Sequence, residues 1–344
     1  MTTIRDIAKK ANVSVATVSR VIHGNGYVKK ETKEIVEEII LETGYQRVSQ
    51  IPDQDYRDFH TVAVLLPSVT DPFYSEILCG VRDYLNTQKF NVMIFSTNED
   101  ETEELNTIRG LQHQKFDGII ISPVNIKGSL SRESIDALDQ LVVPVVVVGR
   151  DMRFVHFDNI FMEEECGAFD AVSLLLRNGH RHIGMLCGHR EITYMNQRYN
   201  GYVAALTNCS GNFDPDYVCF GDMEVEEAYQ MTDHLLSLNP SPTAIFCSDP
   251  IYTLGFVKYM LDHQMVIGRD LSVVSYGDVE LLSALKFNIT SVIKKSFDMG
   301  EHAAEVLLKR ITYQNSSEII RTALVPEIKI RGSEKMQGLT PASV

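Results

Sequence analysis

Several features that assign a chain to a particular class of protein are missing from this sequence. No apolar run approaches the ~20 residues that a membrane-spanning helix needs. The first residues show no basic and apolar leader, so we expect a cytoplasmic protein that does not bind a membrane. The six cysteines are scattered, with no pair at metal-ligand spacing, so we expect reduced, mostly buried thiols.

The signatures of enzyme chemistry are also missing. The only glycine-rich fragment, residues 24–26, lacks the third glycine of a dinucleotide-binding loop and does not lead from a strand into a helix. We find no nucleophile elbow and no phosphate-binding loop. Three histidines and a cysteine lie within residues 180–189, but alternate residues of a strand point to opposite faces, which disfavours a metal site. We therefore expect no enzyme activity, no cofactor and no metal.

Charge is abundant but unevenly distributed along the chain. The formal net charge is -14, yet residues 1–50 hold eight Lys and Arg against six Asp and Glu, which leaves -16 for the other 294 residues. With 344 residues, 44% of them hydrophobic, the chain is long enough for two or three domains. An acidic body suppresses indiscriminate attraction to nucleic acid, so any DNA binding must come from a placed element in the basic part.

The amino-terminal residues predict three short helices. Apolar residues spaced at i, i+3, i+4 and i+7 begin at Ile4, and Asn12 and Val13 then make a tight turn. Ser14 is placed to cap a second helix that runs to about Ile22, and a third helix covers roughly residues 30–43 and ends at Gly44. This order predicts a helix-turn-helix. The core residues that we expect are Ile4, Ile7, Ala8, Ala11, Val18, Val21, Ile22, Ile35, Val36, Ile39 and Ile40.

The second helix leaves a short, mixed face outside this core. Arg20 can donate to guanine edges or phosphates, and Val15 and Ala16 can contact thymine methyl groups. Thr17 and Ser19 suit phosphates. The alternative is the ordinary polar side of an amphipathic helix, but the capped turn and the third helix favour a DNA-reading surface.

Residues 3–36, TIRDIAKKANVSVATVSRVIHGNGYVKKETKEIV, resemble the amino-terminal domain of the lactose-repressor (LacI/GalR) family of bacterial transcription regulators. The resemblance implies that Val15, Ala16 and Arg20 stand at the main base-reading positions, and that other residues of the head hold the DNA backbone. His23 replaces an Asn that is common in the family. The DNA-binding residues that we expect are Ser14, Val15, Ala16, Thr17, Ser19, Arg20, His23, Thr32 and Tyr45.

Beyond residue 61 the sequence alternates between strands and helices. Two series of apolar runs predict an α/β fold of two doubly wound parallel lobes, with ligands bound where strands end. The family resemblance implies that these lobes are of periplasmic-binding-protein type. The runs begin at Val62, Val92, Gly118, Val142, Ile183, Ala244 and Leu271. The expected domains are a helix-turn-helix head at 1–45, an atypical linker at 46–61 and an effector-binding body at 62–335, with lobe 1 at about 62–160 plus 291–322 and lobe 2 at about 161–290 plus 323–335.

The family resemblance continues through the body, for example in DPFYSEILCGV and DLSVVSYGD, and it implies a small-molecule effector, often a sugar. A sugar needs charged or amide groups and an aromatic wall. Arg198, in NQRYNGY, matches the family's effector-binding arginine. Asp71 and Asp249 are equally placed to cap the helices that follow them. The effector-binding residues that we expect are Asp71, Phe73, Tyr74, Arg150, Arg198, Ser248, Asp249 and Asp278.

The sequence differs from the family pattern at three places that contact the effector or the DNA in other members. Gly277 stands where members usually carry an acidic or amide residue, so a hydroxyl contact is lost there unless Asp278 replaces it, and Gly149 replaces an Asp. In the linker, Arg47 and Val48 replace the Pro-Asn of the family's hinge helix. Gln54 stands at the position of the wedging Leu, while a proline and three aspartates disfavour a helix that binds DNA. We predict that this chain does not bend DNA with a leucine wedge in the usual manner, or does so weakly.

Together these patterns predict a sequence-specific transcriptional regulator that binds operator DNA as a homodimer. We expect a repressor of carbohydrate-utilisation genes, controlled by a sugar or sugar derivative bound between the lobes. Such an effector changes DNA affinity only by its different affinity for two states, typically ~1 to 3 kcal/mol. The alternative is a receptor-like sugar-binding protein whose DNA-binding function is weak or degenerate.

Overall fold

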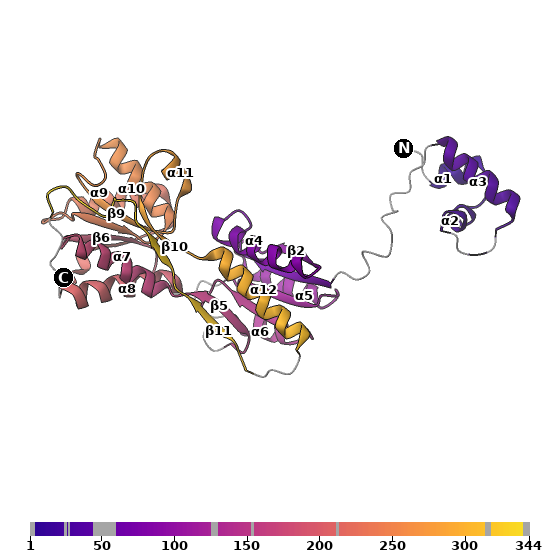
Figure 1. Cartoon of the computed structure of the whole chain (residues 1–344), viewed down its shortest axis with the longest axis horizontal. Coiled ribbons are helices and arrows are strands. Elements are labelled where there is room, and N and C mark those ends of the chain that lie inside the picture. The colour runs from indigo at the N-terminus through magenta and orange to yellow at the C-terminus, as the bar shows by residue number, and fades with distance from the viewer. Residues whose placement is uncertain are drawn as a thin grey trace. The chain divides into compact units, whose positions relative to one another are not determined.

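The structure is a computed structural model that describes residues 4–23, 26, 28–43, 60–124, 130–152, 155–210, 213–313 and 318–339. The chain divides into two compact units, Met1–Phe59 and His60–Val344. The first unit is helical, and the second contains two sheets covered by helices (Figure 1). Gly44, Tyr45 and nearly all of the linker expected at 46–61 lie outside the described residues.

The first unit has the expected helix-turn-helix, formed by α1 (Ile4–Lys10), α2 (Val15–His23) and α3 (Lys30–Thr43). Asn12 adopts a positive φ of 52°, which a short polar residue tolerates, and this turns the chain between α1 and α2. The amide of Thr17 then donates to Oγ of Ser14 (3.1 Å), so Ser14 caps α2 as predicted.

The core of this unit is small. Ile7, Ala8, Val18 and Val36 are buried, and Ala11, Val13, Val21, Ile22, Ile39 and Ile40 pack against them. The prediction was wrong for Ile35, which is 49% exposed. Val36, Ile39 and Ile40 form the inward stripe of α3, and Ile35 lies at its edge, where two short neighbouring helices do not cover it.

The second unit contains two six-stranded sheets with the same arrangement. The first sheet has the order β11-β5-β4-β3-β1-β2 and is parallel throughout, and the second has the order β12-β10-β9-β8-β6-β7, with only β12 antiparallel. The first sheet's strands are β1 (His60–Leu66), β2 (Phe90–Ser96), β3 (Gly118–Ile121), β4 (Val145–Val148), β5 (Asp158–Met162) and β11 (Arg321–Leu324). The second sheet's are β6 (Ile183–Cys187), β7 (Val218–Phe220), β8 (Ala244–Cys247), β9 (Ser272–Tyr276), β10 (Thr290–Ile293) and β12 (Glu327–Lys329).

Helices cover both faces of the sheets, which confirms the doubly wound prediction. In β1, Val62 and Val64 pack in one core cluster, whereas Ala63 and Leu65 pack in another. Lobe 1 has α4 (Pro72–Thr87), α5 (Glu101–Leu111), α6 (Arg132–Asp139) and α12 (Ser296–Thr312). Lobe 2 has α7 (Glu164–Arg177), α8 (Thr193–Ser210), the 3-10 turn η1 (Pro215–Tyr217), α9 (Val225–Leu236), α10 (Pro250–Asp262) and α11 (Glu280–Ala284).

Three details differ from the sequence predictions. The run that begins at Val142 forms a strand only from Val145, after Pro144, and Val142 itself is fully exposed. The lobe boundary expected at 291 falls inside β10, which belongs to the second sheet, so the chain returns to lobe 1 only after Ile293. All six cysteines are free thiols, but only Cys187 and Cys247 are buried. The prediction of mostly buried thiols was wrong for Cys166 and Cys209, which lie on exposed faces of α7 and α8.

Candidate functional site

The predicted reading face of α2 is accessible. Val15 is 44% exposed, Ala16 and Arg20 are exposed, and Thr17 and Ser19 are half-buried. Ser14 Oγ lies 2.9 Å from Thr17 Oγ1, so these two side chains support the helix start as well as lying beside the face. Thr32 is half-buried in the first turn of α3, while the side chain of His23 and all of Tyr45 lie outside the described residues.

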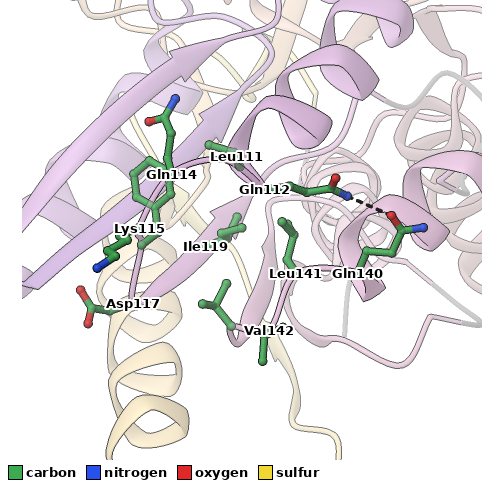
Figure 2. Close-up of a pocket in the computed structure, with 11 residues that line it drawn as sticks. Leu111, Gln112, Gln114, Lys115, Asp117, Ile119, Gln140, Leu141 and Val142 are labelled. Atoms are coloured by element: carbon green, nitrogen blue, oxygen red, sulfur yellow. Dashed lines mark hydrogen bonds between the residues drawn. The ribbon is translucent and has the colours of Figure 1, made fainter.

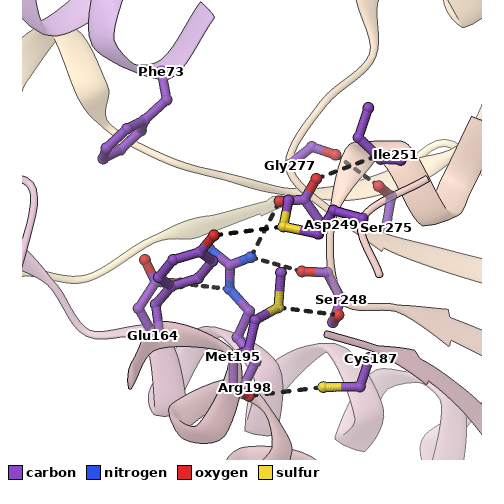
Figure 3. A network of polar contacts seen from close by, with 12 residues as sticks. Phe73, Glu164, Cys187, Met195, Arg198, Ser248, Asp249, Ile251, Ser275 and Gly277 are labelled. Atoms are coloured by element: carbon purple, nitrogen blue, oxygen red, sulfur yellow. Dashed lines mark hydrogen bonds and ion pairs between the residues drawn. The ribbon is translucent and has the colours of Figure 1, made fainter. Parts of the chain in front are cut away.

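In the body, Arg198 is the centre of a buried polar network (Figure 3). It lies on α8 and is 1% exposed. Its Nε donates to Glu164 Oε2 (2.7 Å), its Nη1 donates to the carbonyl of Ser248 (2.7 Å), and Asp249 Oδ2 is 3.5 Å from Nη1. The rings of Tyr276 and Tyr194 lie 4.0 and 4.8 Å from its guanidinium carbon. These contacts fix the guanidinium in one orientation, which makes it a preorganised group.

A glycine explains how Arg198 reaches Glu164 on the neighbouring helix. A Cβ on Gly201, one turn further along α8, would lie only 2.2 Å from the carbonyl oxygen of Glu165 on α7. The absence of that Cβ lets the two backbones approach, which places the first turn of α7 beside Arg198. The R-x-x-G spacing therefore has a packing reason, because the glycine sets the distance between α7 and α8 at which Arg198 reaches Glu164.

Burial and charge act against each other in this network. Burial alone would raise the pKa of Glu164, but Arg198 and Lys294 hold that pKa below its usual value. Burial raises the pKa of Asp249, and Lys294 and Arg198 only partly oppose the shift. Burial also lowers the pKa of Lys294, and the charge of Arg198 lowers it further. Desolvation thus disfavours the charged forms of these side chains, and the attraction between opposite charges opposes it.

Lobe 1 contributes aromatic rings and a second arginine. Arg150 Nη2 donates to the hydroxyl of Tyr74 (2.6 Å), whose pKa burial raises to about 12. The guanidinium of Arg150 also lies 4.9 Å from the ring of Tyr194, which belongs to lobe 2. Lys294 Nζ, just after β10, lies 5.0 Å from the ring of Phe73. We call the interlobe site the following residues: Phe73, Tyr74, Arg150, Glu164, Tyr194, Arg198, Asp249 and Lys294.

The structure therefore brings most of the predicted effector residues together, with three qualifications. Asp71 accepts from the amide of Phe73 (2.8 Å), so it caps α4. Ser248 turns its hydroxyl to the sulfur of Met195 (3.5 Å). Asp278 is directed away from the interlobe site, because Arg331 Nη2 donates to it (2.5 Å).

Four residues of this region were missed by sequence reasoning: Glu164, Tyr194, Tyr276 and Lys294. Glu164 and Lys294 follow β5 and β10, two strands that no apolar run indicated. Because ligand groups gather where parallel strands end, locating those strands would have located both residues.

The two glycines that depart from the family pattern are required by the backbone. Gly277 has a φ of +96°, and a Cβ there would lie 2.8 Å from Pro250. Gly149 has a φ of +81°, and a Cβ there would lie 3.2 Å from the ring of Phe73. Since Arg331 holds Asp278, no carboxylate replaces the contact expected at 277. Instead, Lys294 Cε lies 3.8 Å from the position of that missing Cβ.

A pocket lies at the amino ends of β3 and β4 in the first sheet, whereas the interlobe site lies at the carboxyl ends (Figure 2). It is lined by the ends of α5 and α6 and by the segments that enter the two strands. Gln112 donates to Gln140 across it (3.1 Å), and Asp117 accepts from the amide of Thr61 (2.7 Å). Its polar groups are thus used by the protein itself, and it lies away from the strand ends where ligand groups gather.

Other classes of site find no support within the described ranges. No set of three or more His, Cys, Asp or Glu side chains there is placed to hold a metal ion. His180 uses both ring nitrogens inside lobe 2, on Thr243 Oγ1 (2.8 Å) and the carbonyl of Glu334 (3.1 Å). No helix in the same ranges has the length and apolar character to cross a membrane.

Comparisons with known proteins agree with both units. Residues 3–47 match "Bacterial regulatory proteins, lacI family", and residues 172–334 match "Periplasmic binding protein-like domain". The catabolite control protein A of Priestia megaterium is 28% identical over 335 residues, covering 97% of this chain and 99% of that protein. The ribose operon repressor of Haemophilus influenzae is 28% identical over 334 residues, covering 97% and 98%.

Among solved structures, a transcriptional regulator CelR in complex with cellobiose is 25% identical, with a TM-score of 0.70, and the alignment covers 97% of this chain and 100% of that one. The likeness thus runs through the helix-turn-helix head and both lobes of the body. The chain thus combines a helix-turn-helix domain of the lacI family of bacterial regulatory proteins with a periplasmic-binding-protein-like domain, as its full-length relatives do.

Proposed function

We propose that this protein is a homodimeric repressor that binds a near-palindromic operator in the cytoplasm, where bacterial DNA lies, and that a carbohydrate or carbohydrate derivative controls it. It acts as a regulator and not as an enzyme. The observation that carries the proposal is the capped helix α2, which presents Val15, Ala16 and Arg20 outward from a folded helix-turn-helix. Two such helices in successive major grooves set half-sites about one helical turn apart.

The roles within the head follow from chemistry and exposure. Arg20 donates to a guanine edge, and Val15 and Ala16 contact thymine methyl groups. Thr17, Ser19 and Thr32 lie beside that face and donate to phosphates, with Ser14 holding the helix start. His23 and Tyr45 complete the backbone contacts in this proposal.

Apolar surface on the body supports a dimer. Leu281 and Leu285, on and just after α11, are both more than half exposed. Met93 and Ile94 are exposed on β2, which is the edge strand of the first sheet. Covering these side chains with a second copy removes apolar surface from water and places two heads on one operator.

The effector part of the proposal rests on the interlobe site. Phe73, Tyr74 and Tyr194 supply rings, while Arg150, Arg198 and Asp249 supply charged groups around them. A small pocket lies between the lobes there, lined by Arg150 and Met162 from one side and by Glu164, Tyr194 and Gln197 from the other. Aromatic walls with fixed polar groups are the usual composition of a carbohydrate site.

The DNA-binding part is tested by selecting binding sites from a random DNA library with the full-length protein, then measuring affinities by mobility shift. We expect a two-fold symmetric consensus. Arg20→Ala should weaken binding to it by about 1–3 kcal/mol, roughly 5- to 150-fold, and relax one base position in each half-site.

The control is Arg109→Ala, which removes one exposed positive charge from α5 of the body and should leave the affinity unchanged. Selection of no consensus, with carbohydrate binding retained, would instead support the receptor-like alternative.

A further inference from the structure

The cations of the interlobe site fall into two groups that differ in their partners. Arg198 has two carboxylates, Glu164 at 2.7 Å and Asp249 at 3.5 Å. Within the described parts of the chain, neither Arg150 nor Lys294 has a carboxylate within 4.0 Å. Glu164 and Asp249 act on Lys294 only from beyond contact distance, so both cations keep hydrogen-bond donors that no carboxylate of the described chain occupies.

The contacts of Lys294 differ from those of the lysine that follows it. Its ammonium lies 5.0 Å from the ring of Phe73, and its Cε lies 3.8 Å from the position that a Cβ on Gly277 would take. The neighbouring Lys295 differs, because its ammonium is paired with Glu327 at 2.5 Å. Two consecutive lysines after β10 therefore differ: Lys295 has a carboxylate in direct contact, and Lys294 has none among the described residues.

Arg150 and Ser122 add donors with unmet hydrogen-bonding capacity. Arg150 binds the Tyr74 hydroxyl through Nη2, but its Nε is buried and has no hydrogen-bond partner among the described residues. The hydroxyl of Ser122, at the end of β3, is likewise buried and unpaired in those residues. Both lie close to the Phe73 and Tyr74 rings, since a Cβ on Gly149 would be 3.3 Å from Ser122 Oγ and 3.2 Å from Phe73. Buried donors left unpaired destabilise a fold unless a ligand satisfies them.

We propose that the effector is an anionic carbohydrate, whose phosphate ester or carboxylate binds to Lys294 and Arg150 beside the Phe73 and Tyr74 rings. This inference rests on the proposed function and specifies its effector. An anion supplies what both groups lack, a negative charge and several acceptor oxygens, whereas a neutral sugar supplies hydroxyls alone. The sugar ring then stacks against Phe73.

The test uses sets of three probes that share one ring: a neutral aldose, its terminal phosphate ester and its uronate. Each set is titrated into the full-length protein by calorimetry, with thermal shift as a screen over several hexoses and pentoses. We expect one anionic member to bind at least tenfold more tightly than its neutral parent. The phosphate and uronate arms identify which anion is recognised.

Lys294→Met should weaken binding of the anionic probe at least tenfold more than it weakens binding of the neutral parent. Lys295→Met is the matched control, because that lysine is adjacent but paired with Glu327, and it should leave both affinities unchanged. Equal affinity for neutral and anionic probes, no binding by any anionic probe, or an unaffected Lys294→Met variant would each overturn the inference.

A mobility shift on the selected operator separates this inference from the proposed function. If operator binding is specific but no anionic probe binds, the regulator stands and the anionic effector is wrong. If anionic probes bind but no operator is selected, the repressor is wrong and the anion site stands.

Discussion

The sheets of the two lobes follow one strand order, yet two buried carboxylates, Glu104 in lobe 1 and Glu164 in lobe 2, differ in their partners. In lobe 1, Glu104 is 2% exposed and accepts from the amide of Val124 (2.6 Å), and burial raises its pKa to about 7. In lobe 2, Glu164 is 7% exposed, but Arg198 and Lys294 hold its pKa below the usual value. A cation in contact therefore outweighs burial at Glu164, whereas no described Lys, Arg or His side chain lies within 4.0 Å of the Glu104 carboxylate.

The largest expected effect comes from removing that cation. Arg198→Ala leaves Glu164 and Asp249 buried without their partner, so we expect the body to lose about 3–5 kcal/mol of unfolding free energy. Arg150→Ala, in lobe 1, removes a cation that no carboxylate contacts and should cost at most about 1.5 kcal/mol. Urea unfolding of both variants measures the difference, and equal losses would refute the contrast between these two arginines.

The next effect concerns Glu104, the buried carboxylate of lobe 1 that no described cation contacts. The pKa of Glu104 is higher in the folded state than the ordinary 4.5, so its contribution is fully present below pH 4.5 and is lost as pH rises through about 7. Over this interval, at about 1.4 kcal/mol per pH unit, the loss approaches roughly 3 kcal/mol. Glu104→Gln keeps an acceptor for Val124 and removes the charge, so it should stabilise the protein at pH 8 and have little effect at pH 4.5.

Melting temperatures measured from pH 4.5 to 8 test this prediction. Glu133→Gln, at an exposed carboxylate in the first turn of α6, is the control and should not change the slope of stability against pH. Parallel pH profiles for wild type and Glu104→Gln would show that Glu104 does not ionise at the cost expected.

The smallest effect compares one glycine from each lobe. Gly277→Ala and Gly149→Ala both place a side chain in the left-handed region, at about 1–2 kcal/mol each. The cost at 277 should be the greater, because the new Cβ meets the rigid ring of Pro250, whereas at 149 it meets movable side chains. Gly110→Ala, in α5 with open space around it, is the control and should stabilise by about 0.5–1 kcal/mol. Thermal unfolding that ranks 149 above 277 would contradict this reasoning.

Much of the fold could be predicted from the sequence because its signals are local. The cap at Ser14, the apolar spacing of the head and the buried runs of the central strands each depend on a few adjacent residues. The strands β5, β7, β10, β11 and β12 were missed because they are short or carry polar residues. Pairing with neighbouring strands defines them, and a pattern of adjacent residues does not contain that information.

The interlobe site could be predicted only in part. Arg198 and Asp249 were found through their motifs, but the sequence does not reveal that they satisfy each other and Glu164. Asp278 follows a strand end like the others, yet Arg331, 53 residues further along the chain, turns it away. Such partners come from distant segments, so local spacing cannot assign them.

The glycine contact between α7 and α8 has a consequence for redesign. Because the helix backbones touch at Gly201, that position tolerates no exchange, and the geometry of Arg198 and Glu164 is a fixed frame. Lys294 and Phe73 project from a crossover segment and a helix start outside that frame. A biosensor built on this chain would accordingly keep the glycine and vary those two positions to change the metabolite that it detects.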